Sequence, residues 1–523
     1  MKGKVWSTLA LLLVNASASA ATLATEGAVM ESSISAEKDA LVVVLGCNDP
    51  DQLISLHANG SSLVQGLDTD PTRIEEARRA IETAGVQGPV SVRLYDGSNL
   101  PYMDNLVNVV VVETALADAG AEILRVLAPR GRALVREAGN QEWLSGMKPP
   151  VKKFQGGFVE FTKPVPSNTD EWGHWLHAPD NNPVAKDDVV DVPRHLQWLQ
   201  GPAWVSSHNL NPAVSALVTS HGRIFSIINE MPPGIGGMED QWMLTARDAF
   251  NGLVLWRHPM KEWGWTHWSP QEYSVEMRFV PPFQVMRRMV AAGDRLFVTP
   301  GFYSPVHVLN AATGETISVL SGTEKTFEIL HVKGTLFLAT NAAIGTDGTI
   351  PDIAVMAVDS QTGRILWKVG GFRGVSGKLN RFFKHANVFL TAGSDYLYLL
   401  DGDYIVCLDQ KTGAQRWRVE RPEKTVPLTD ADIESLAEGR ERSPNVPKYR
   451  ADQYFPNNCA MVYSDGVLVL SQIRNTEENH KTRLKKTALT AAYDAGSGRE
   501  LWRFDSATFA HFVPLDLFVI DSN

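Results

Sequence analysis

Residues that could contact a small ligand follow three strand-like, mostly apolar runs near the start of this 523-residue chain. The runs at 41–45, 63–67 and 90–95 are followed, in that order, by Gly46, Asp68 and Asp96. Continuous apolar runs are typical of parallel strands that are buried on both faces. Open parallel sheets bind their ligands at the carboxyl ends of the strands. One interpretation of the three residues is therefore a small-molecule site at that edge of a sheet.

Histidines offer a second chemistry, because imidazole is a common metal ligand. His174 and His177 are three residues apart in the tryptophan-rich stretch 172–182, and His267 lies further on, also beside tryptophans. A structural zinc needs four convergent ligands, and no carboxylate completes a recognisable ligand pattern here. We therefore predict no metal site and expect these histidines to pack beside aromatic rings with one hydrogen bond each.

Strands and helices alternate over residues 38–140, which predicts a doubly wound α/β sheet of the Rossmann-like type. The expected elements are strands at 41–45, 63–68, 90–95, 106–113 and 131–135, with one helix between the first two strands and others at 71–83 and 121–127. Residues 141–170 contain Lys148–Pro150 and Pro164–Pro166, and clusters of proline mark connecting segments. We predict that they form a linker to a second domain.

The first domain resembles a class I S-adenosylmethionine-dependent methyltransferase domain. The turn Leu127–Gly131 is similar to the segment that precedes the fifth strand in that family. The resemblance implies that the backbone at Gly46 approaches the methionine part of the cofactor. It also implies that Asp68 binds the ribose hydroxyls and that Asp96 meets the adenine.

The turn after the first strand departs from the family pattern, which has two or three glycines. Here Gly46 is followed by Cys47-Asn48-Asp49-Pro50. Side chains obstruct the close approach that glycine permits, and Pro50 lacks a backbone donor. We therefore predict a structural domain without a cofactor. Retained methyltransferase activity and binding of another small molecule are the alternatives.

A phrase with Asp or Asn, Gly four residues later and Trp eight residues later recurs in the second part of the chain. Its copies begin at Asp248, Asp359, Asp409 and Asp494, with a fifth at Asn310 that has Ser318 in place of Trp. Asp and Gly at this spacing favour a tight hairpin turn. A second turn and apolar strand precede each copy, and two hairpins make a four-stranded blade. The repetition predicts an all-β propeller over 171–523, with about five legible blades.

The phrase resembles the tryptophan-docking repeat of pyrroloquinoline-quinone-type (PQQ) propellers, which include quinoprotein dehydrogenases and BamB-type assembly proteins. The resemblance implies structural, blade-docking roles for Trp256, Trp367, Trp417 and Trp502. The stretch 172–182 looks like the lead-in to the first blade of such propellers. The dehydrogenases use a disulfide of adjacent cysteines, and no such pair occurs here, so PQQ is not expected. The two-domain combination resembles uncharacterised exported proteins of planctomycete-type bacteria.

The N-terminus has the three parts of a secretory signal peptide. Lys2 and Lys4 precede the apolar run Val5–Val14, and Ala18-Ser19-Ala20 forms a small-residue cleavage site. We predict cleavage after Ala20 and a periplasmic or otherwise exported protein. No later run approaches the ~20 apolar residues of a transmembrane helix. The net charge of −10 argues against a nucleic-acid partner.

The last part of the chain predicts an interrupted ring. The long interval between Asp409 and Asp494 predicts an insertion at 422–449, with a short helix at 430–438. Residues 513–521 are similar to the opening strand of another blade. Because an open ring exposes sheet edges, we predict a C-terminally truncated form of a longer propeller.

No complete set of catalytic residues accompanies these features, so whether the chain is an enzyme stays open. We predict an exported propeller scaffold that binds a protein or glycan partner at its rim. An S-adenosylmethionine-dependent methyltransferase is the first alternative, and a quinone-dependent oxidoreductase is the second.

Overall fold

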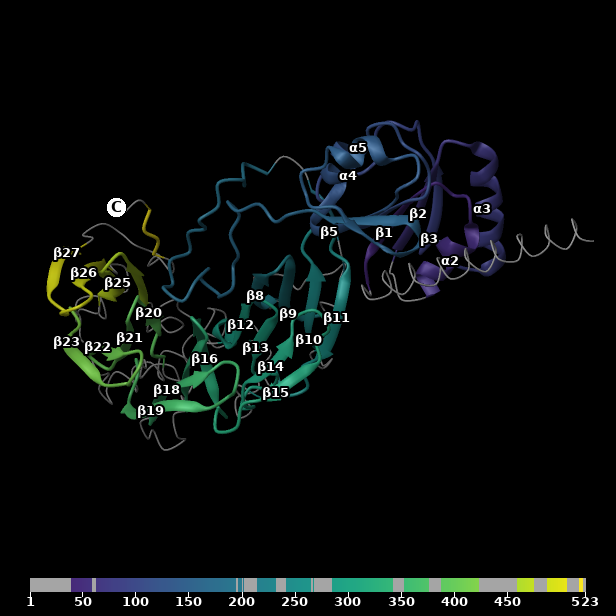
Figure 1. The fold of residues 1–523 in the computed structure, drawn as a ribbon. Helices are drawn as coiled ribbons and strands as arrows, with labels where there is room; N and C mark the ends of the chain where they lie inside the picture. The colour runs from purple at the N-terminus through teal and green to yellow at the C-terminus, as the bar shows by residue number, and fades with distance from the viewer. Residues whose placement is uncertain are drawn as a thin grey trace, which may run out of the picture. The chain divides into compact units, whose positions relative to one another are not determined.

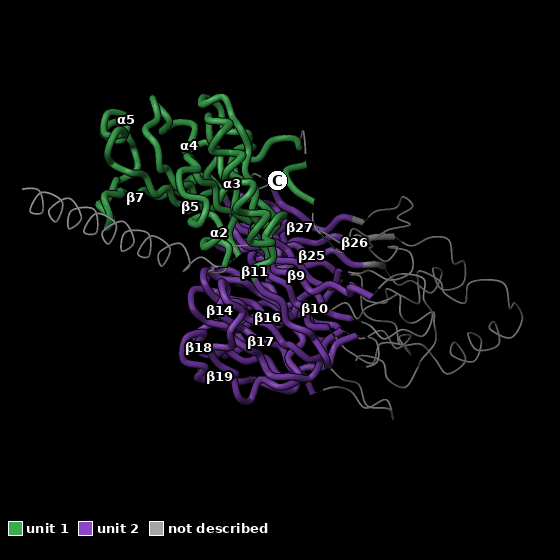
Figure 2. Tube along the Cα trace, turned by 90° about the vertical axis from the view of Figure 1, so that its right-hand side faces the viewer, with its two compact units in different colours: residues 1–169, 187–201, 247–255 green, residues 170–186, 202–246, 256–523 purple. Residues whose placement is uncertain are grey.

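The computed structural model describes residues 39–58, 63–193, 196–199, 201, 214–231, 241–264, 267, 285–341, 352–375, 387–422, 459–474, 487–505 and 517–520. The chain divides into two compact units (Figure 2). The first contains residues 1–169, 187–201 and 247–255, and the second contains residues 170–186, 202–246 and 256–523. The predicted signal peptide and the predicted insertion after residue 422 lie outside the described residues.

A seven-stranded sheet organises the first unit, with the strand order β3-β2-β1-β4-β5-β7-β6. Figure 1 labels β1, β2, β3 and β5 of this sheet. Its strands are β1 (Leu41–Leu45), β2 (Leu63–Asp68), β3 (Val90–Leu94), β4 (Val107–Val112), β5 (Leu127–Arg136), β6 (Lys152–Lys153) and β7 (Phe158–Thr162). The first five strands pair in parallel. Valine-rich β1 and β4 lie at the centre, where β-branched side chains are buried on both faces. The predicted α/β fold is confirmed.

Helices cover both faces of this sheet. They are α2 (Pro50–Ala58), α3 (Pro71–Ala84), α4 (Gly120–Val126) and α5 (Gln141–Ser145). Leucines of α2 and apolar residues of α3 pack with Val42 and Val44, whereas α4 and α5 pack with Val43 and Leu45. The alternation of neighbouring β1 side chains between two cores follows from the two-residue period of a strand.

Residues 141–170 differ from the predicted linker. They contain α5, β6 and β7, and β7 pairs antiparallel with β5, so the sheet extends past residue 140. Val159 and Phe161 enter the core on one face and Phe158 enters it on the other. The alternating run Phe158–Thr162 is a strand signal that the neighbouring prolines obscured.

Five four-stranded antiparallel sheets form the described part of the repeat region. Their strands, in chain order, are β8 (Val214–Ser220), β9 (Arg223–Asn229), β10 (Trp242–Asp248) and β11 (Val254–Pro259); β12 (Met289–Ala292), β13 (Arg295–Val298), β14 (His307–Asn310) and β15 (Thr316–Val319); β16 (Thr326–Val332), β17 (Thr335–Thr340), β18 (Ile353–Asp359) and β19 (Ile365–Phe372); β20 (Thr391–Ala392), β21 (Tyr396–Asp401), β22 (Tyr404–Asp409) and β23 (Gln415–Glu420); β24 (Cys459–Ser464), β25 (Val467–Arg474), β26 (Thr487–Asp494) and β27 (Glu500–Asp505). The predicted propeller blades are confirmed.

The repeated phrase forms the turn between the third and fourth strands of each blade. Asp359 Oδ1 accepts hydrogen bonds from the backbone N–H groups of Gln361 and Thr362, at 3.1 and 2.8 Å. Gly363 follows with a φ of 74°, a conformation that side chains disfavour. The local sequence therefore specifies the turn that joins the two outer strands.

The predicted strand at 513–521 is described only over residues 517–520, which form no strand. Val519 instead exchanges two hydrogen bonds with the side chain of Asn182. Within the described ranges, no helix is long and apolar enough to cross a membrane.

Candidate functional site

Gly46 forms the turn at the carboxyl end of β1. Its φ is 102°, and its N–H donates to the carbonyl of Leu67 at 2.8 Å. A Cβ at this position would lie 3.3 Å from Cβ of Glu113, at the end of β4. Glycine is therefore required here by the positive φ and by close packing between neighbouring strand ends.

Asp68, the predicted ribose-binding acid, is buried at the end of β2, with 3% of its surface exposed. Its Oδ2 accepts the N–H of Cys47 at 2.8 Å, and its Oδ1 accepts the N–H of Asp70 at 2.8 Å. Arg73 Nη1 lies 3.1 Å from Oδ2. The carboxylate thus fastens the turn after β1 to the start of α3.

Arg73 is a partner of Asp68 that the sequence does not predict. It lies in the first turn of α3, which begins with Asp70 as N-cap and Pro71. Besides Asp68, its Nη1 donates to Asn48 Oδ1 at 3.0 Å, so one guanidinium joins two of the strand ends. The only sequence signal is a basic residue five positions after the acid, which is also common on solvated helix faces.

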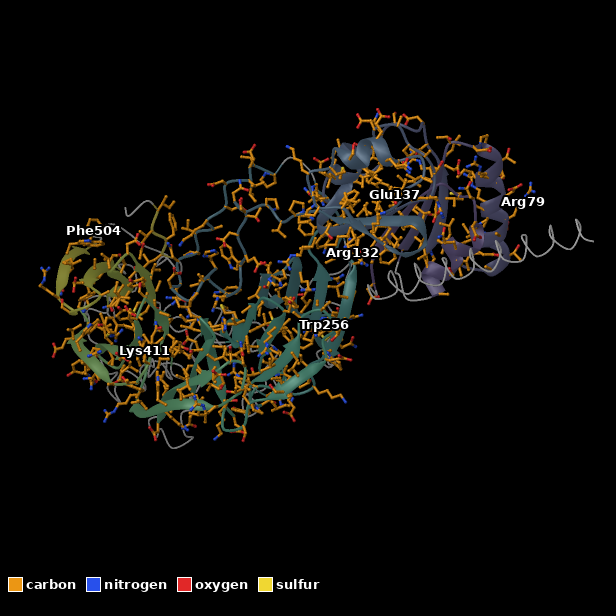
Figure 3. All side chains as sticks on the ribbon, viewed as in Figure 1. Arg79, Arg132, Glu137, Trp256, Lys411 and Phe504 are labelled. Carbon is orange, nitrogen blue, oxygen red and sulfur yellow. The ribbon has the colours of Figure 1, made fainter. Side chains whose placement is uncertain are left out.

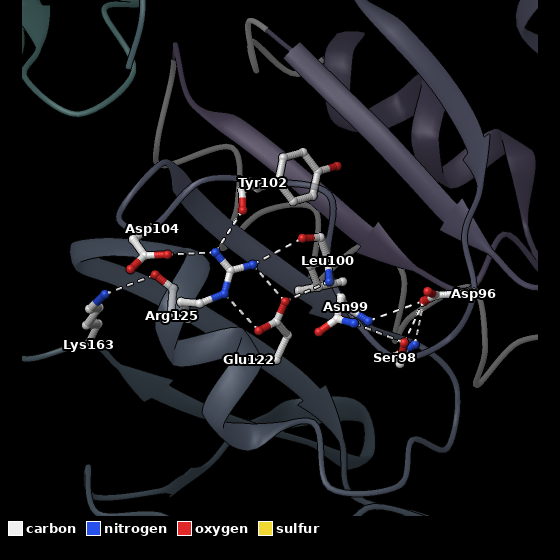
Figure 4. A network of polar contacts seen from close by, with 9 residues as sticks. All are labelled: Asp96, Ser98, Asn99, Leu100, Tyr102, Asp104, Glu122, Arg125 and Lys163. Atoms are coloured by element: carbon white, nitrogen blue, oxygen red, sulfur yellow. Dashed lines mark hydrogen bonds and ion pairs between the residues drawn. The ribbon is translucent and has the colours of Figure 1, made fainter. Parts of the chain in front are cut away.

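Asp96, the predicted adenine contact, is exposed and caps its own turn. Its Oδ1 accepts hydrogen bonds from the N–H and the hydroxyl of Ser98 and from the N–H of Asn99 (Figure 4). These bonds, that from the Ser98 N–H first, lower the pKa of the carboxyl below its ordinary value. Asp96 is therefore a charged, solvent-facing group beside a fixed turn.

Tyr95 lies among the ends of β1, β2 and β3. Burial raises the pKa of its phenol, and the charges of Asp68, Asp96 and Cys47 raise it further. The Cys47 thiol is itself buried, and burial together with the Asp68 charge raises its pKa to about 12. Since the thiolate is the reactive form of cysteine, Cys47 is not an activated nucleophile.

Arg125 fixes the loop that follows Asp96. Its guanidinium contacts Glu122 and Asp104 and donates to the carbonyls of Leu100 and Tyr102, at distances from 2.7 to 3.1 Å (Figure 4). Glu122 also accepts the N–H of Leu100 at 2.7 Å, and the hydrogen bonds from Arg125 lower its pKa. A charge-assisted network of this kind holds loop backbone in one conformation.

Glu113, at the end of β4, is also paired. Arg136 donates to its Oε2 at 2.7 Å, and Gln52 of α2 donates to its Oε1 at 3.1 Å. Of the predicted cofactor residues, Gly46 and Asp68 therefore meet through the Cys47 N–H and β2. Asp96 follows Tyr95, whose backbone N–H donates to the Asp68 carbonyl at 3.1 Å.

The histidines of stretch 172–182 have protein partners. His174 Nε2 accepts the backbone N–H of His331 at 3.0 Å, and His177 Nε2 lies 2.6 Å from Asp170 Oδ2. His177 also packs edge-on against Trp172. In the described part of the chain, no group of three or more metal-ligating side chains converges.

Three of the four predicted blade-docking tryptophans contact the next blade, and the indole N–H of each of these three donates to a turn carbonyl. Trp256 donates to Ala311, Trp367 to Gln410 and Trp417 to Ala495, at 2.9 to 3.1 Å. Each acceptor directly follows the Asp or Asn of the next phrase. Trp502 is 49% exposed, whereas Trp256 is 8% exposed.

Known family models match part of each region. Residues 43–135 match the family model described as "Methyltransferase domain", and residues 351–439 match the one described as "Outer membrane protein assembly factor BamB". The chain carries a methyltransferase-type domain and BamB-type propeller repeats. Each match spans less than half of the chain. No curated protein matches it.

Solved structures with similarity to this chain include methyltransferases. The [4+2]-cyclase SpnF is 19% identical, with a TM-score of 0.19, and the match covers 20% of this chain and 43% of that one. A protein described as a sarcosine dimethylglycine methyltransferase, from Galdieria sulphuraria, is 18% identical, with a TM-score of 0.20 and coverages of 22% and 46%. One described as an S-adenosyl-L-methionine-dependent methyltransferase, from Methanococcus maripaludis, is 15% identical, with a TM-score of 0.24 and coverages of 28% and 89%. The chain thus spans less than half of the first two.

Proposed function

We propose that this chain is an exported binding protein in which the methyltransferase-type domain is a structural domain that does not use S-adenosylmethionine. The observation that carries the proposal is the state of Asp68. A ribose diol needs a carboxylate with free acceptor positions. Both oxygens of Asp68 already accept a backbone N–H group, and Arg73 Nη1 lies 3.1 Å from Oδ2 and 3.5 Å from Oδ1.

Freeing Asp68 for a ligand is energetically unfavourable. The N–H of Cys47 would lose a buried partner, and an unsatisfied buried donor costs about 1–3 kcal/mol. Arg73 would also lose one of its two carboxylate partners, the other being Asp70, and its partial exposure reduces that cost. A ligand would have to offset both terms before it gained any affinity.

The turn after β1 supports the same proposal. Gly46 is its only glycine, and α2 begins at Pro50, only four residues later. The intervening Asp49 uses its carboxylate to accept the N–H of Asp51 at 3.1 Å. Residues 47–49 carry side chains at positions where a Gly-rich turn would let a ligand approach the backbone. Pro50 also lacks a backbone N–H that could donate to a ligand.

Export and partner binding complete the proposal. The signal-like sequence Lys2–Ala20 supports export, and BamB-type repeats support a protein-binding role, since that family is described as an assembly factor. The three cysteines are free and buried, and no two of them are adjacent in the sequence, which gives no support for quinone chemistry of the adjacent-disulfide type.

Isothermal titration calorimetry of the full chain with S-adenosylmethionine tests the proposal. We expect no saturable binding up to millimolar cofactor by the wild type. Arg73→Ala opens one acceptor position on Asp68, and Arg73→Lys is its charge-matched control. Saturable binding by the wild type, lost in Asp68→Asn, would overturn the proposal in favour of the methyltransferase alternative.

Export is tested separately by the N-terminus of the protein recovered from its host. We expect the mature chain to begin at residue 21 and to fractionate outside the cytoplasm. A full-length chain that keeps residues 1–20 and remains in the cytoplasm would contradict this part of the proposal.

A further inference from the structure

The turn of the first phrase, residues 248–253, belongs to the first unit (Figure 2). It connects β10 to β11 and resembles the turns of the later copies. Asp248 Oδ1 accepts the N–H groups of Phe250 and Asn251 at 2.7 and 3.1 Å. Gly252 follows with a φ of 75°. The backbone of this turn is thus specified by the same local signals as in the other copies.

The third and fourth residues of the first phrase differ from those of the later copies. In the later copies both residues are exposed, and they are Ala312 and Thr313, Gln361 and Thr362, Lys411 (labelled in Figure 3) and Thr412, and Gly496 and Ser497. In the first copy they are Phe250 and Asn251, and both are half-buried. A half-buried phenylalanine, where the other copies have small or polar exposed residues, indicates that this turn faces protein.

The fourth residue uses its side chain differently in the first copy. In three later copies it is a hydroxyl residue that donates to the aspartate of its own phrase, at 2.6 to 3.0 Å: Thr362, Thr412 and Ser497. Asn251 instead directs its amide away from the turn. Its Nδ2 donates to the Leu106 carbonyl at 3.2 Å and to Asn108 Oδ1 at 2.7 Å. The asparagine therefore binds another segment of the first unit, where a threonine binds its own turn.

Asn108, at the amino end of β4, is the centre of this contact. Its Nδ2 donates to Asp248 Oδ2 at 2.8 Å, so it uses the carboxylate oxygen that does not cap the turn. Its Oδ1 accepts both Asn251 Nδ2 and the N–H of Leu41, the first residue of β1, the latter at 2.9 Å. One side chain thus connects the amino ends of two central strands to the two polar residues of the turn.

A second segment of the first unit also contacts the turn. Gln197 Nε2 donates to the Phe250 carbonyl at 2.8 Å and to the Asn105 carbonyl at 3.3 Å, so it bridges the turn and the loop before β4. The indole N–H of Trp198 donates to the Ala249 carbonyl at 3.1 Å. The turn therefore has hydrogen-bond partners in two segments that are far apart in the sequence, which is typical of a specific contact.

We infer that the amino-terminal edge of the α/β sheet, centred on Asn108, is a binding surface whose occupant is the turn 248–253 of the same chain. The methyltransferase-type domain thereby holds a hairpin of the repeat region. It does so with the end of its sheet opposite to the strand ends where Gly46 and Asp68 lie. The inference goes beyond the function proposed above and does not depend on whether those strand ends bind a cofactor.

A swap of donor and acceptor tests the surface, with hydrogen exchange of the full chain measured by mass spectrometry. Asn108→Asp places a second carboxylate beside Asp248, and the two like charges repel. The amides of residues 248–253 should then exchange about ten-fold faster or more, because the turn loses its contacts with β4. Adding Asp248→Asn restores a donor–acceptor pair and should return the rate to within about two-fold of the wild type. Asn310 shows that the phrase accepts asparagine at this position.

Two further variants separate docking from the fold of the sheet. Asn251→Thr gives the first copy the residue of the later copies, so the turn keeps its own cap and loses its reach to Leu106 and Asn108. It leaves the sheet unchanged and should also speed exchange of residues 248–253. Asn99→Asp adds the same charge as Asn108→Asp at an exposed site after β3, and it should leave that exchange unchanged.

Cross-linking gives an independent reading of proximity. A short bis-methanethiosulfonate reagent should join the pair Asn108→Cys and Asn251→Cys, since these side chains are within hydrogen-bond distance and the native cysteines are buried. It should not join Asn251→Cys to Ser98→Cys, because Ser98 follows β3 at the carboxyl end of the sheet. No cross-link at 108 and 251, exchange unaffected by Asn108→Asp and Asn251→Thr, or a swapped pair no better than Asn108→Asp alone would overturn the inference.

Discussion

Aspartates end strands in both units, but their structural roles differ. In the first unit, Asp68 is buried, and its oxygens accept the N–H groups of Cys47 and Asp70. In the second, Asp359 is exposed and caps the turn of its own phrase. A repeated residue such as Asp359 reveals its role through its copies. A single residue such as Asp68 reveals its role only through its partners, which lie elsewhere in the chain.

The largest expected difference in stability is between variants of Trp256 and Trp502, which occupy the same position of the repeated phrase. Trp256→Ala removes a buried indole and its hydrogen bond to Ala311, which should lower the free energy of unfolding by about 3–5 kcal/mol. Trp502→Ala removes a half-exposed indole and should change it by within about 0.5 kcal/mol. Urea denaturation measures both. Equal losses would show that the contact of Trp256 with the next blade does not contribute to stability.

Asp68 should stabilise the folded first unit. Asp68→Ala leaves the buried N–H of Cys47 without an acceptor and removes one of the two carboxylates that Arg73 contacts, with an expected loss of about 1–3 kcal/mol. Asn48→Ala, which removes only the exposed acceptor of Arg73, is the matched control and should cost less than about 0.5 kcal/mol. An Asp68→Ala chain as stable as the wild type would contradict the structural role.

His174 should make the second unit sensitive to acid. Burial, and then the charges of His331 and His177, lower its pKa from 6.5 to about 3. Below pH 6.5 the unfolded chain takes up a proton that the folded chain does not bind until about pH 3. This site should therefore reduce stability as pH falls across that window, by up to about 1.4 kcal/mol per unit.

The His174→Gln variant provides the control, because it keeps an acceptor for the His331 N–H and does not titrate. The urea midpoint of the wild type should fall more steeply than that of the variant between pH 6.5 and 4.5. Parallel pH profiles would show that protonation of His174 does not reduce the stability of the second unit.

The smallest effect compares two glycines with positive φ. Gly402, with a φ of 57°, has open space where a Cβ would lie, so Gly402→Ala should cost about 1 kcal/mol from the backbone alone. Gly46→Ala should cost more, because its Cβ would also press on Glu113 and Thr114. Thermal unfolding of both variants checks the order, and the reverse order would contradict the packing at the end of β1.

The sequence predicted the strand and helix order of the first unit and the blades of the second because periodicity and repetition are local signals. It did not predict α5, β6 or β7, and at β7 nearby prolines outweighed a short alternation at 158–162. Arg73 and Tyr95 could not be identified as partners of Asp68, because their convergence depends on tertiary packing. The indole N–H of Trp198 donates to the Ala249 carbonyl in the turn of the first phrase, but Trp198 lacks the spacing of the phrase. The side chain of Asn182 pairs with the backbone of Val519, and no local pattern predicts that contact.

The most direct measurement uses the three cysteines of the chain, since selective ¹⁵N-cysteine labelling gives one amide signal each for Cys47, Cys407 and Cys459. The Cys47 amide is the donor to Asp68, and the other two serve as internal references. If Asp68 is committed to its internal partners, millimolar S-adenosylmethionine should leave all three signals in place. A Cys47 shift that saturates with cofactor while the other two remain fixed would contradict the account.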